Sequence, residues 1–135
     1  MSVSADRAVY LDSSALVKLV VRERESAALA AYLATRPVRI TSLLARVEVP
    51  RAVSRHGAQA VERAAKVIAD VRLLALDDGT LDAAGALDVE ALRSLDVIHV
   101  ASAMALGGDL ETLITYDERM TIAAERLGLR CGAPA

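Results

Sequence analysis

The sequence predicts an α/β fold in which a parallel sheet is wrapped by helices on both faces. Two patterns alternate along the 135 residues. Short apolar runs with β-branched residues are bounded by polar or turn residues, which is typical of buried strands. Longer segments rich in Ala and Leu carry apolar residues at helical spacing. Strands that alternate with helices in this way favour parallel pairing through helical crossovers.

The first half of the chain has the pattern of a strand, two helices, a strand and a helix. Its strand candidates, RAVYLD and VRITS, contain β-branched residues and end in polar ones. The helix candidates carry Leu, Val and Ala at intervals of three and four residues. Ser42 precedes the third helix and has the side chain of an N-cap. These patterns predict strands over 7–12 and 38–42, and helices over 14–22, 25–35 and 43–55.

The second half continues the alternation. Its strand candidates, RLLAL and ETLITY, are again short apolar runs. Gly57, Gly107 and Gly128 stand where helices or their connections stop. These patterns predict strands over 72–76 and 111–116, and helices over 58–71, 81–92, 95–106 and 119–127.

The length and composition fit one domain over residues 1–135 with an aliphatic core. Hydrophobic residues make up 54% of the chain, whereas Phe and Trp are absent. Cys131 is the single cysteine and cannot form an intrachain disulfide. Neither a secretory leader nor a membrane span is recognisable, so we expect a cytoplasmic protein. The formal net charge of −2 neither predicts nor excludes a nucleic-acid partner.

Four acidic residues stand where this topology brings side chains together. Asp12 ends the first strand, and Asp117 follows the strand over 111–116. Ligands of open α/β sheets bind outside the carboxyl ends of the strands, which is where both carboxylates lie. Glu48 follows Ser42 by about one and a half helical turns, and Asp96 opens a later helix, so both can reach this edge. We therefore expect convergence of Asp12, Glu48, Asp96 and Asp117.

Carboxylates that converge repel one another, and without a counter-ion one or more of them would have to bind a proton. A divalent cation removes this cost. Oxygen ligands without thiolates or paired histidines suit Mg²⁺ or Mn²⁺ rather than Zn²⁺. Such ions favour phosphoryl transfer, because they lower the pKa of a bound water and offset charge on phosphate oxygens. The acidic residues therefore predict a site for one or two Mg²⁺ or Mn²⁺ ions.

The sequences around these acidic residues resemble the PIN domain, and most closely its VapC toxins. The resemblance lies in YLDSSALVKL, ITSLLARVEVPRAV, LRSLDVIHVASAMALGGD and LITYDERMTIAAERLGL, which follow the order of the family between residues 8 and 130. It implies a three-layer α/β/α sandwich with a central, mainly parallel sheet. It also implies a Mg²⁺- or Mn²⁺-dependent endoribonuclease that is the toxin of a toxin–antitoxin pair.

By position, the resemblance assigns the four acidic residues to metal binding and catalysis. It makes Ser14 and Thr115 hydroxyls that support the acidic cluster, although strand-end hydroxyls also commonly bond nearby backbone. Ser13 is not included in the predicted site. The partners that the resemblance implies are an RNA substrate, a cognate antitoxin whose C-terminal segment occupies the groove, and a second copy of the chain in a homodimer.

Two arginines are our candidates for RNA contacts. Arg51 and Arg55 recur at helical spacing on the side of Glu48. Glu48 has an alternative interpretation as an ordinary helical ion pair with Arg51. His99 lies one turn after Asp96, but a lone histidine in an apolar helix is more often packed or hydrogen-bonded locally. We therefore assign His99 no catalytic role.

Two other functions stay open at this point. A phosphoacceptor receiver domain also places carboxylates at strand ends, but it has adjacent acidic residues after its first strand. This chain instead has Asp12 followed by two serines. A PIN-fold module that binds RNA or a protein without cleavage is the second alternative, and the presence of all four carboxylates argues against it.

Overall fold

The computed structural model describes residues 7–135. The strands are β1 (Ala8–Leu11), β2 (Arg39–Ser42), β3 (Arg72–Leu74), β4 (Leu110–Ile114) and β5 (Cys131–Gly132). The helices are α1 (Ser13–Val20), α2 (Ser26–Leu33), α3 (Ala45–Val53), α4 (Ala58–Ala69), α5 (Asp78–Ala86), α6 (Ser94–Met104) and α7 (Glu118–Arg126). None of the helices described is long and apolar enough to cross a membrane. The domain predicted over 1–135 includes residues 1–6, which lie outside the described part.

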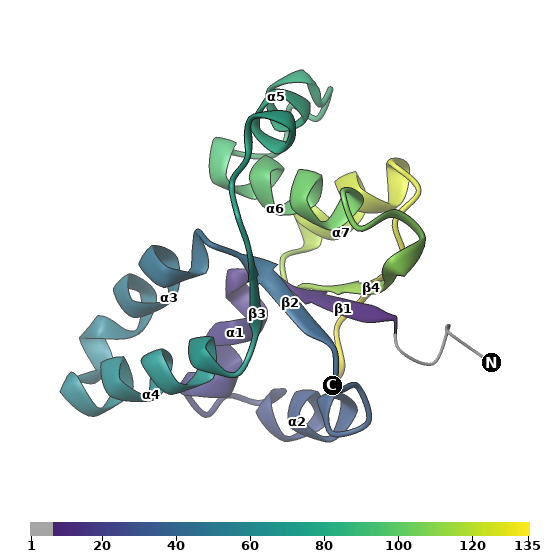
Figure 1. Cartoon of the computed structure of the whole chain (residues 1–135). Coiled ribbons are helices and arrows are strands. Elements are labelled where there is room, and N and C mark those ends of the chain that lie inside the picture. Colours follow the sequence, from purple (N-terminus) through teal and green to yellow (C-terminus); the bar gives the residue numbers. More distant parts are fainter. Residues whose placement is uncertain (1–6) are drawn as a thin grey trace.

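The strands of the described residues pair in parallel, in the order β3-β2-β1-β4-β5. Helices cover both faces of this sheet. In Figure 1, α1 to α4 lie on one side, and α6 and α7 lie on the other with α5 beyond α6. The predicted three-layer sandwich with a parallel central sheet is therefore confirmed.

The central strand β1 is buried on both faces, and its side chains alternate between two cores. Val9 and Leu11 pack in the cluster formed with α1 to α4. Ala8 and Tyr10 pack in the cluster formed with α6 and α7. Successive side chains of a strand point to opposite faces, so a central strand under two helical layers is apolar along its whole length. The strand itself therefore carries no carboxylate, and Asp12 follows directly after its end.

Parallel pairing aligns the carboxyl ends of the strands at one edge of the sheet. Leu11 of β1 lies opposite Ile114 of β4, so Asp12 and Thr115 leave their strands at the same level. The amide of Asp12 donates a hydrogen bond to the carbonyl of Ile114 at 3.2 Å. The fold thereby brings Asp12 to Thr115 across 103 positions of sequence.

The helix predicted over 81–92 is wrong in its bounds. It corresponds to α5, which begins earlier because Asp77 caps it by accepting from the amide of Thr80 at 2.7 Å. The helix ends at Ala86, and residues 87–93 connect it to α6.

Two further details at strand ends differ from the sequence prediction. Ser42 ends β2 instead of capping α3, and its hydroxyl accepts from the amide of Leu44 at 3.1 Å. The sequence pattern does not predict β5, which has only two residues. Its position is set by backbone hydrogen bonds such as the one from the Thr115 amide to the Gly132 carbonyl at 3.0 Å.

Candidate active site

Asp12 is the most deeply placed carboxylate at the carboxyl edge of the sheet. It caps α1 and is only 3% exposed. Its Oδ1 accepts from the Ser14 hydroxyl at 2.7 Å and from the Ala15 amide at 2.9 Å, and its Oδ2 accepts from the Thr115 hydroxyl at 2.5 Å. Burial raises the pKa of Asp12, although these hydrogen bonds oppose the rise. None of these partners carries a positive charge that would offset the buried carboxylate.

The Thr115 and Ser14 hydroxyls connect Asp12 to the segment that leads into α7. Thr115 Oγ1 accepts from the amide of Asp117 at 3.1 Å, and Ser14 Oγ accepts from the amide of Tyr116 at 3.0 Å. Asp117 caps α7, because its Oδ1 accepts from the Arg119 amide at 2.9 Å. The two hydroxyls therefore bond a carboxylate on one side and a backbone amide on the other, and they fix residues 115–117 against Asp12.

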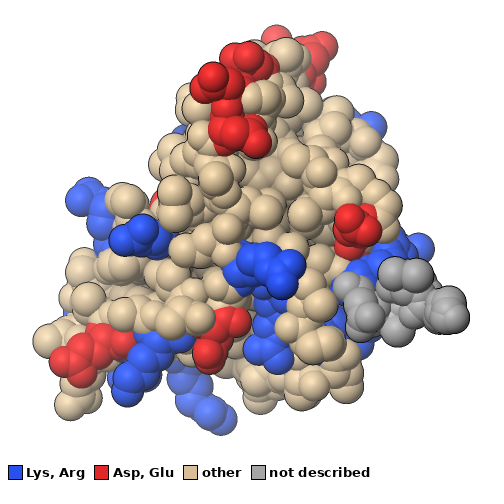
Figure 2. Space-filling view, in the orientation of Figure 1, with Lys and Arg blue, Asp and Glu red and all other residues tan. Residues whose placement is uncertain are grey.

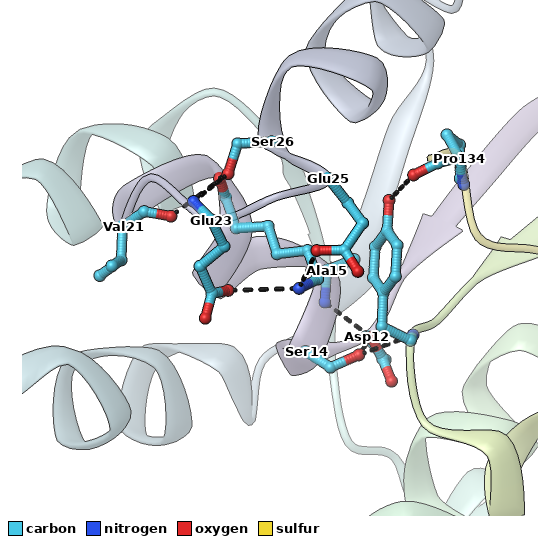
Figure 3. A network of polar contacts seen from close by, with 10 residues as sticks. Asp12, Ser14, Ala15, Val21, Glu23, Glu25, Ser26 and Pro134 are labelled. Atoms are coloured by element: carbon cyan, nitrogen blue, oxygen red, sulfur yellow. Dashed lines mark hydrogen bonds and ion pairs between the residues drawn. The ribbon is translucent and has the colours of Figure 1, made fainter.

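A second set of contacts holds Tyr116 on its other side. The Lys18 ammonium lies 4.7 Å from the centre of the Tyr116 ring, and it pairs with Glu25 at 2.9 Å and Glu23 at 3.3 Å. The Tyr116 hydroxyl donates to the carbonyl of Pro134 at 2.7 Å. Figure 3 shows both glutamates turned toward the ammonium group, with Asp12 and Ser14 beside them. The Tyr116 ring is thus held by Lys18, and its hydroxyl is held by the Pro134 carbonyl.

Glu48 reaches the same edge from α3. Its side chain is 19% exposed, and its Oε1 accepts from the Ser13 hydroxyl at 2.6 Å and from His99 Nε2 at 2.7 Å. Burial alone would raise the pKa of Glu48, but the bonds from His99 and Ser13 outweigh it, so the pKa is lowered. Glu48 is therefore ionised at neutral pH. The ordinary helical pair with Arg51 is absent from the ion pairs of residues 7–135.

His99 and Ser13 are the residues that sequence reasoning left out. His99 is buried and hydrogen-bonded, as expected, but its bonds are not local: they join α6 to Glu48 of α3 and to Tyr10 of β1. Ser13 is the neighbour of Asp12 and contacts Glu48 through its hydroxyl. The sequence did carry one indication that His99 lies near the site: it follows Asp96 by three positions, and residues three apart on a helix share a face.

Asp96 lies in the first turn of α6, and its side chain is 23% exposed. Its nearest charged partner is Arg93, whose Nε is 3.8 Å from Oδ2, and the Arg93 side chain is largely exposed. No hydrogen bond joins the Asp96 side chain to the other three carboxylates within the described chain. Its connection to them runs through α6, on which His99 follows one turn later.

Hydroxyl groups link three of the four carboxylates, Asp12, Glu48 and Asp117, but the four do not form a closed set of ligands. Asp12 is linked to Asp117 through Thr115, and to Glu48 through the adjacent Ser13. As the side chains stand, no three carboxylate, imidazole or thiol groups of residues 7–135 are close enough to hold one ion together. The donor chemistry nevertheless fits Mg²⁺ or Mn²⁺: the carboxylates and hydroxyls supply oxygen, and buried Asp12 lacks a cationic partner.

Charge is unevenly distributed over the face of the molecule shown in Figure 2. Acidic side chains gather over α5, at the top of Figure 2, whereas Lys and Arg predominate across the middle and lower parts of that face. Arg51 on α3 and Arg55 on the following turn (η2, Ser54–His56) are both exposed. Neither forms an ion pair within the described residues. Both guanidinium groups are therefore accessible to an anionic ligand.

Comparison with known proteins finds relatives that are named ribonucleases. The PIN domain model matches residues 9–126. Ribonuclease VapC46 of Mycobacterium tuberculosis (strain ATCC 25618 / H37Rv) is 51% identical over 128 residues, which cover 95% of this chain and 98% of that protein. Ribonuclease VapC35 of the same strain is 41% identical over 130 residues, which cover 93% and 96%.

Solved structures share the fold at lower sequence identity. The crystal structure of Mycobacterium tuberculosis VapC20, a Sarcin-Ricin loop cleaving toxin, has a TM-score of 0.72 and 18% identity, and covers 85% of this chain and 94% of that chain. VapBC2 from Rickettsia felis, bound to a DNA fragment from its promoter, has a TM-score of 0.71 and 15% identity, and covers 95% and 99%. At identities below 25%, these two structures show only that the chain shares their fold.

Proposed function

The chain belongs to the PIN domain family, and from this premise we propose that it is a metal-dependent endoribonuclease, the toxin of a toxin–antitoxin pair. Because the chain belongs to the PIN domain family, it is not a phosphoacceptor receiver domain. The observation that carries the proposal is Asp12, a buried carboxylate at the carboxyl edge of a parallel sheet whose partners are all neutral. A buried carboxylate with no cationic partner, at the edge where ligands of such sheets bind, is suited to bind a cation in addition to capping α1.

The residues proposed to hold the ion are Asp12, Asp96 and Asp117, with Glu48 completing the set. Mg²⁺ or Mn²⁺, as one or two ions, would supply charge to offset the phosphate and would lower the pKa of a water molecule when bound there. Thr115 and Ser14 fix the position of Asp12 and of the segment that carries Asp117. These residues thus position the groups proposed to bind the ion. The proposed reaction is hydrolysis of an RNA phosphodiester bond.

The proposed partners follow from the same family. Ribonuclease names among the relatives support RNA as the substrate, and a toxin–antitoxin complex from Klebsiella pneumoniae is among the structures that share the fold. A cognate antitoxin is accordingly the expected protein partner, and a homodimer stays an expectation of the family resemblance alone. An enzyme that acts on cellular RNA meets its substrate in the cytoplasm, where we place this protein.

One observation favours a second candidate, a PIN-fold module that binds without cleaving. No three ligand groups in residues 7–135 are placed to hold one ion together. The test is incubation of the purified protein with total cellular RNA, with Mg²⁺ or Mn²⁺ and with a chelator. We expect cleavage with either metal and none with the chelator. Intact RNA under every condition, with retained RNA binding, would establish the binding module instead.

Arg55→Ala should weaken RNA binding and flatten its salt dependence. A phosphate contact releases about one counter-ion, so its loss lowers the slope of log affinity against log salt by about one unit. Arg72 is the matched control: it is exposed, but it begins β3 and so lies at the amino edge of the sheet, away from the site. Binding titrations at several salt concentrations measure both variants. An unchanged slope for Arg55→Ala would remove Arg55 from the RNA contacts.

A further inference from the structure

His99 is a buried side chain that joins three elements at the candidate site. It extends from α6, and it is only 1% exposed. Its Nε2 lies 2.7 Å from Oε1 of Glu48 on α3, and its Nδ1 lies 2.7 Å from the hydroxyl of Tyr10 on β1. The Tyr10 and His99 rings meet edge to face, with centroids 5.8 Å apart. Both ring nitrogens are therefore used: Nδ1 contacts β1, and Nε2 contacts α3 and also the Ser13 hydroxyl of α1 at 3.3 Å.

The chemistry of the three groups sets the direction of the hydrogen bonds. An ionised carboxylate only accepts, so Nε2 must carry the proton that bonds Glu48. In a neutral imidazole Nδ1 then has a free lone pair, which accepts from the Tyr10 hydroxyl. With the imidazole neutral, Tyr10 therefore donates to His99 and His99 donates to Glu48. We call these three residues the Tyr10–His99–Glu48 chain.

This chain holds one oxygen of Glu48 and leaves the other available. Oε1 accepts from His99 and from the Ser13 hydroxyl at 2.6 Å. Oε2 accepts no hydrogen bond within the described residues. Two donors on one oxygen fix the plane of the carboxylate, so the second oxygen has a defined direction. A carboxylate fixed in this way loses less conformational entropy when it binds a ligand than a freely rotating one.

We propose that Tyr10 and His99 are positioning residues of the nuclease site, which keep His99 in the Nε2–H tautomer and present Oε2 of Glu48 to the divalent ion. This inference rests on the function proposed above. It assigns a role to a histidine and a tyrosine that never touch the substrate. Hydrogen-bonded partners of metal-binding side chains commonly orient them in this way, and their removal costs about 10–100-fold in metal affinity or activity.

The tautomer is measured by nitrogen-15 NMR of the imidazole rings at pH 8. The chain has two histidines, and exposed His56 serves as an internal reference. We expect His99 to be the Nε2–H tautomer alone, whereas His56, whose Nε2 accepts a long hydrogen bond from Arg55 at 3.4 Å, should not be. Tyr10→Phe should make His99 a mixture as well, because it removes the hydroxyl that bonds Nδ1. A proton on Nδ1 of His99 in the wild-type protein would overturn the proposal.

Ion affinity tests the role of the chain in the function. Mn²⁺ binding by calorimetry should weaken about tenfold in Tyr10→Phe. Tyr32→Phe is the matched control, because Tyr32 lies on α2 against Arg36 and does not contact His99. His99→Gln keeps an N–H donor and should retain more affinity than His99→Leu. The turnover rate on RNA should fall in Tyr10→Phe while the KM stays close to wild type, because the arginines are unchanged.

The outcomes separate this inference from the proposed function. If the wild-type protein binds Mn²⁺ and cleaves RNA, and Tyr10→Phe does both equally well, the positioning role is wrong and the nuclease function stands. If the wild-type protein does neither, the function fails, and the positioning role fails with it. Thermal melts of each variant identify loss of the fold, and Tyr10→Phe, which keeps the buried ring, is the variant expected to remain folded.

Discussion

We expect the Asp96→Asn protein to fold normally and to cleave RNA at least about 100-fold more slowly than wild type. Removal of a group that only orients a metal ligand already costs about 10–100-fold, and loss of a ligand should cost at least as much. Asp96 is placed for this role in the first turn of α6, partly exposed and without a hydrogen bond to another side chain in the described residues. Expression of the variant should no longer arrest bacterial growth.

The fold should survive this change, because Asp96 contributes little to it. A carboxylate at a helix N-terminus is worth about 0.3–1 kcal/mol, which corresponds to a few degrees of melting temperature in a domain of this size. Asp82→Asn, at an exposed position of α5, is the control and should cleave at the wild-type rate. Retention of more than about a tenth of the wild-type rate by Asp96→Asn would exclude Asp96 as a metal ligand.

Local sequence patterns were sufficient to predict the sheet and most of its helices. β1 is an apolar run, as expected of a central strand under two helical layers, while β2 and β4 combine β-branched and apolar residues with polar ones. All three strands end at the predicted edge. The pattern failed at β5, where two residues carry no periodicity, and after Ala86, where apolar residues continue beyond the end of α5. Backbone pairing, rather than sequence periodicity, determines β5, and capping determines where α5 begins.

The sequence predicts which carboxylates form the candidate site, and their role as ligands stays a prediction; it does not predict the contacts that hold Glu48. Asp12 and Asp117 follow strands, so topology alone places them at one edge. The contacts of His99 are different in kind: its partners Glu48 and Tyr10 are 51 and 89 positions away. A histidine in an apolar helix has the same local sequence whether its partners are backbone groups or distant side chains. The role of His99 therefore becomes visible only in three dimensions.

Mn²⁺ should raise the melting temperature of the wild-type protein by several degrees. An ion that binds only the folded state stabilises it by about 2.7 kcal/mol at a hundred times its dissociation constant. In a domain of this size that gain shifts the melt by several degrees. Asp12→Asn should erase most of the shift, because it replaces the buried carboxylate that we place at the centre of the site.

Without metal, Asp12→Asn should leave the melt unchanged or raise it at neutral pH. Burial raises the pKa of Asp12 in the folded protein, so the folded state binds the proton more tightly than the unfolded chain. The stability contributed by this group is fully present below its unfolded pKa, about 4, and is lost as the pH rises through its folded pKa. The wild-type protein should therefore lose stability relative to Asp12→Asn as the pH rises through this window. If the melting temperatures of the wild-type protein and of Asp12→Asn changed with pH in the same way, burial would not raise the pKa of Asp12.

The most direct test of the acidic site is the Mn²⁺-induced change in melting temperature of three proteins: wild type, Asp12→Asn and Asp82→Asn. Asp82 lies exposed on α5, so its amide variant controls for non-specific binding to surface carboxylates. We predict equal upward shifts for wild type and Asp82→Asn, and little or no shift for Asp12→Asn. Equal shifts in all three proteins would show that the ion binds elsewhere and would contradict the proposed site.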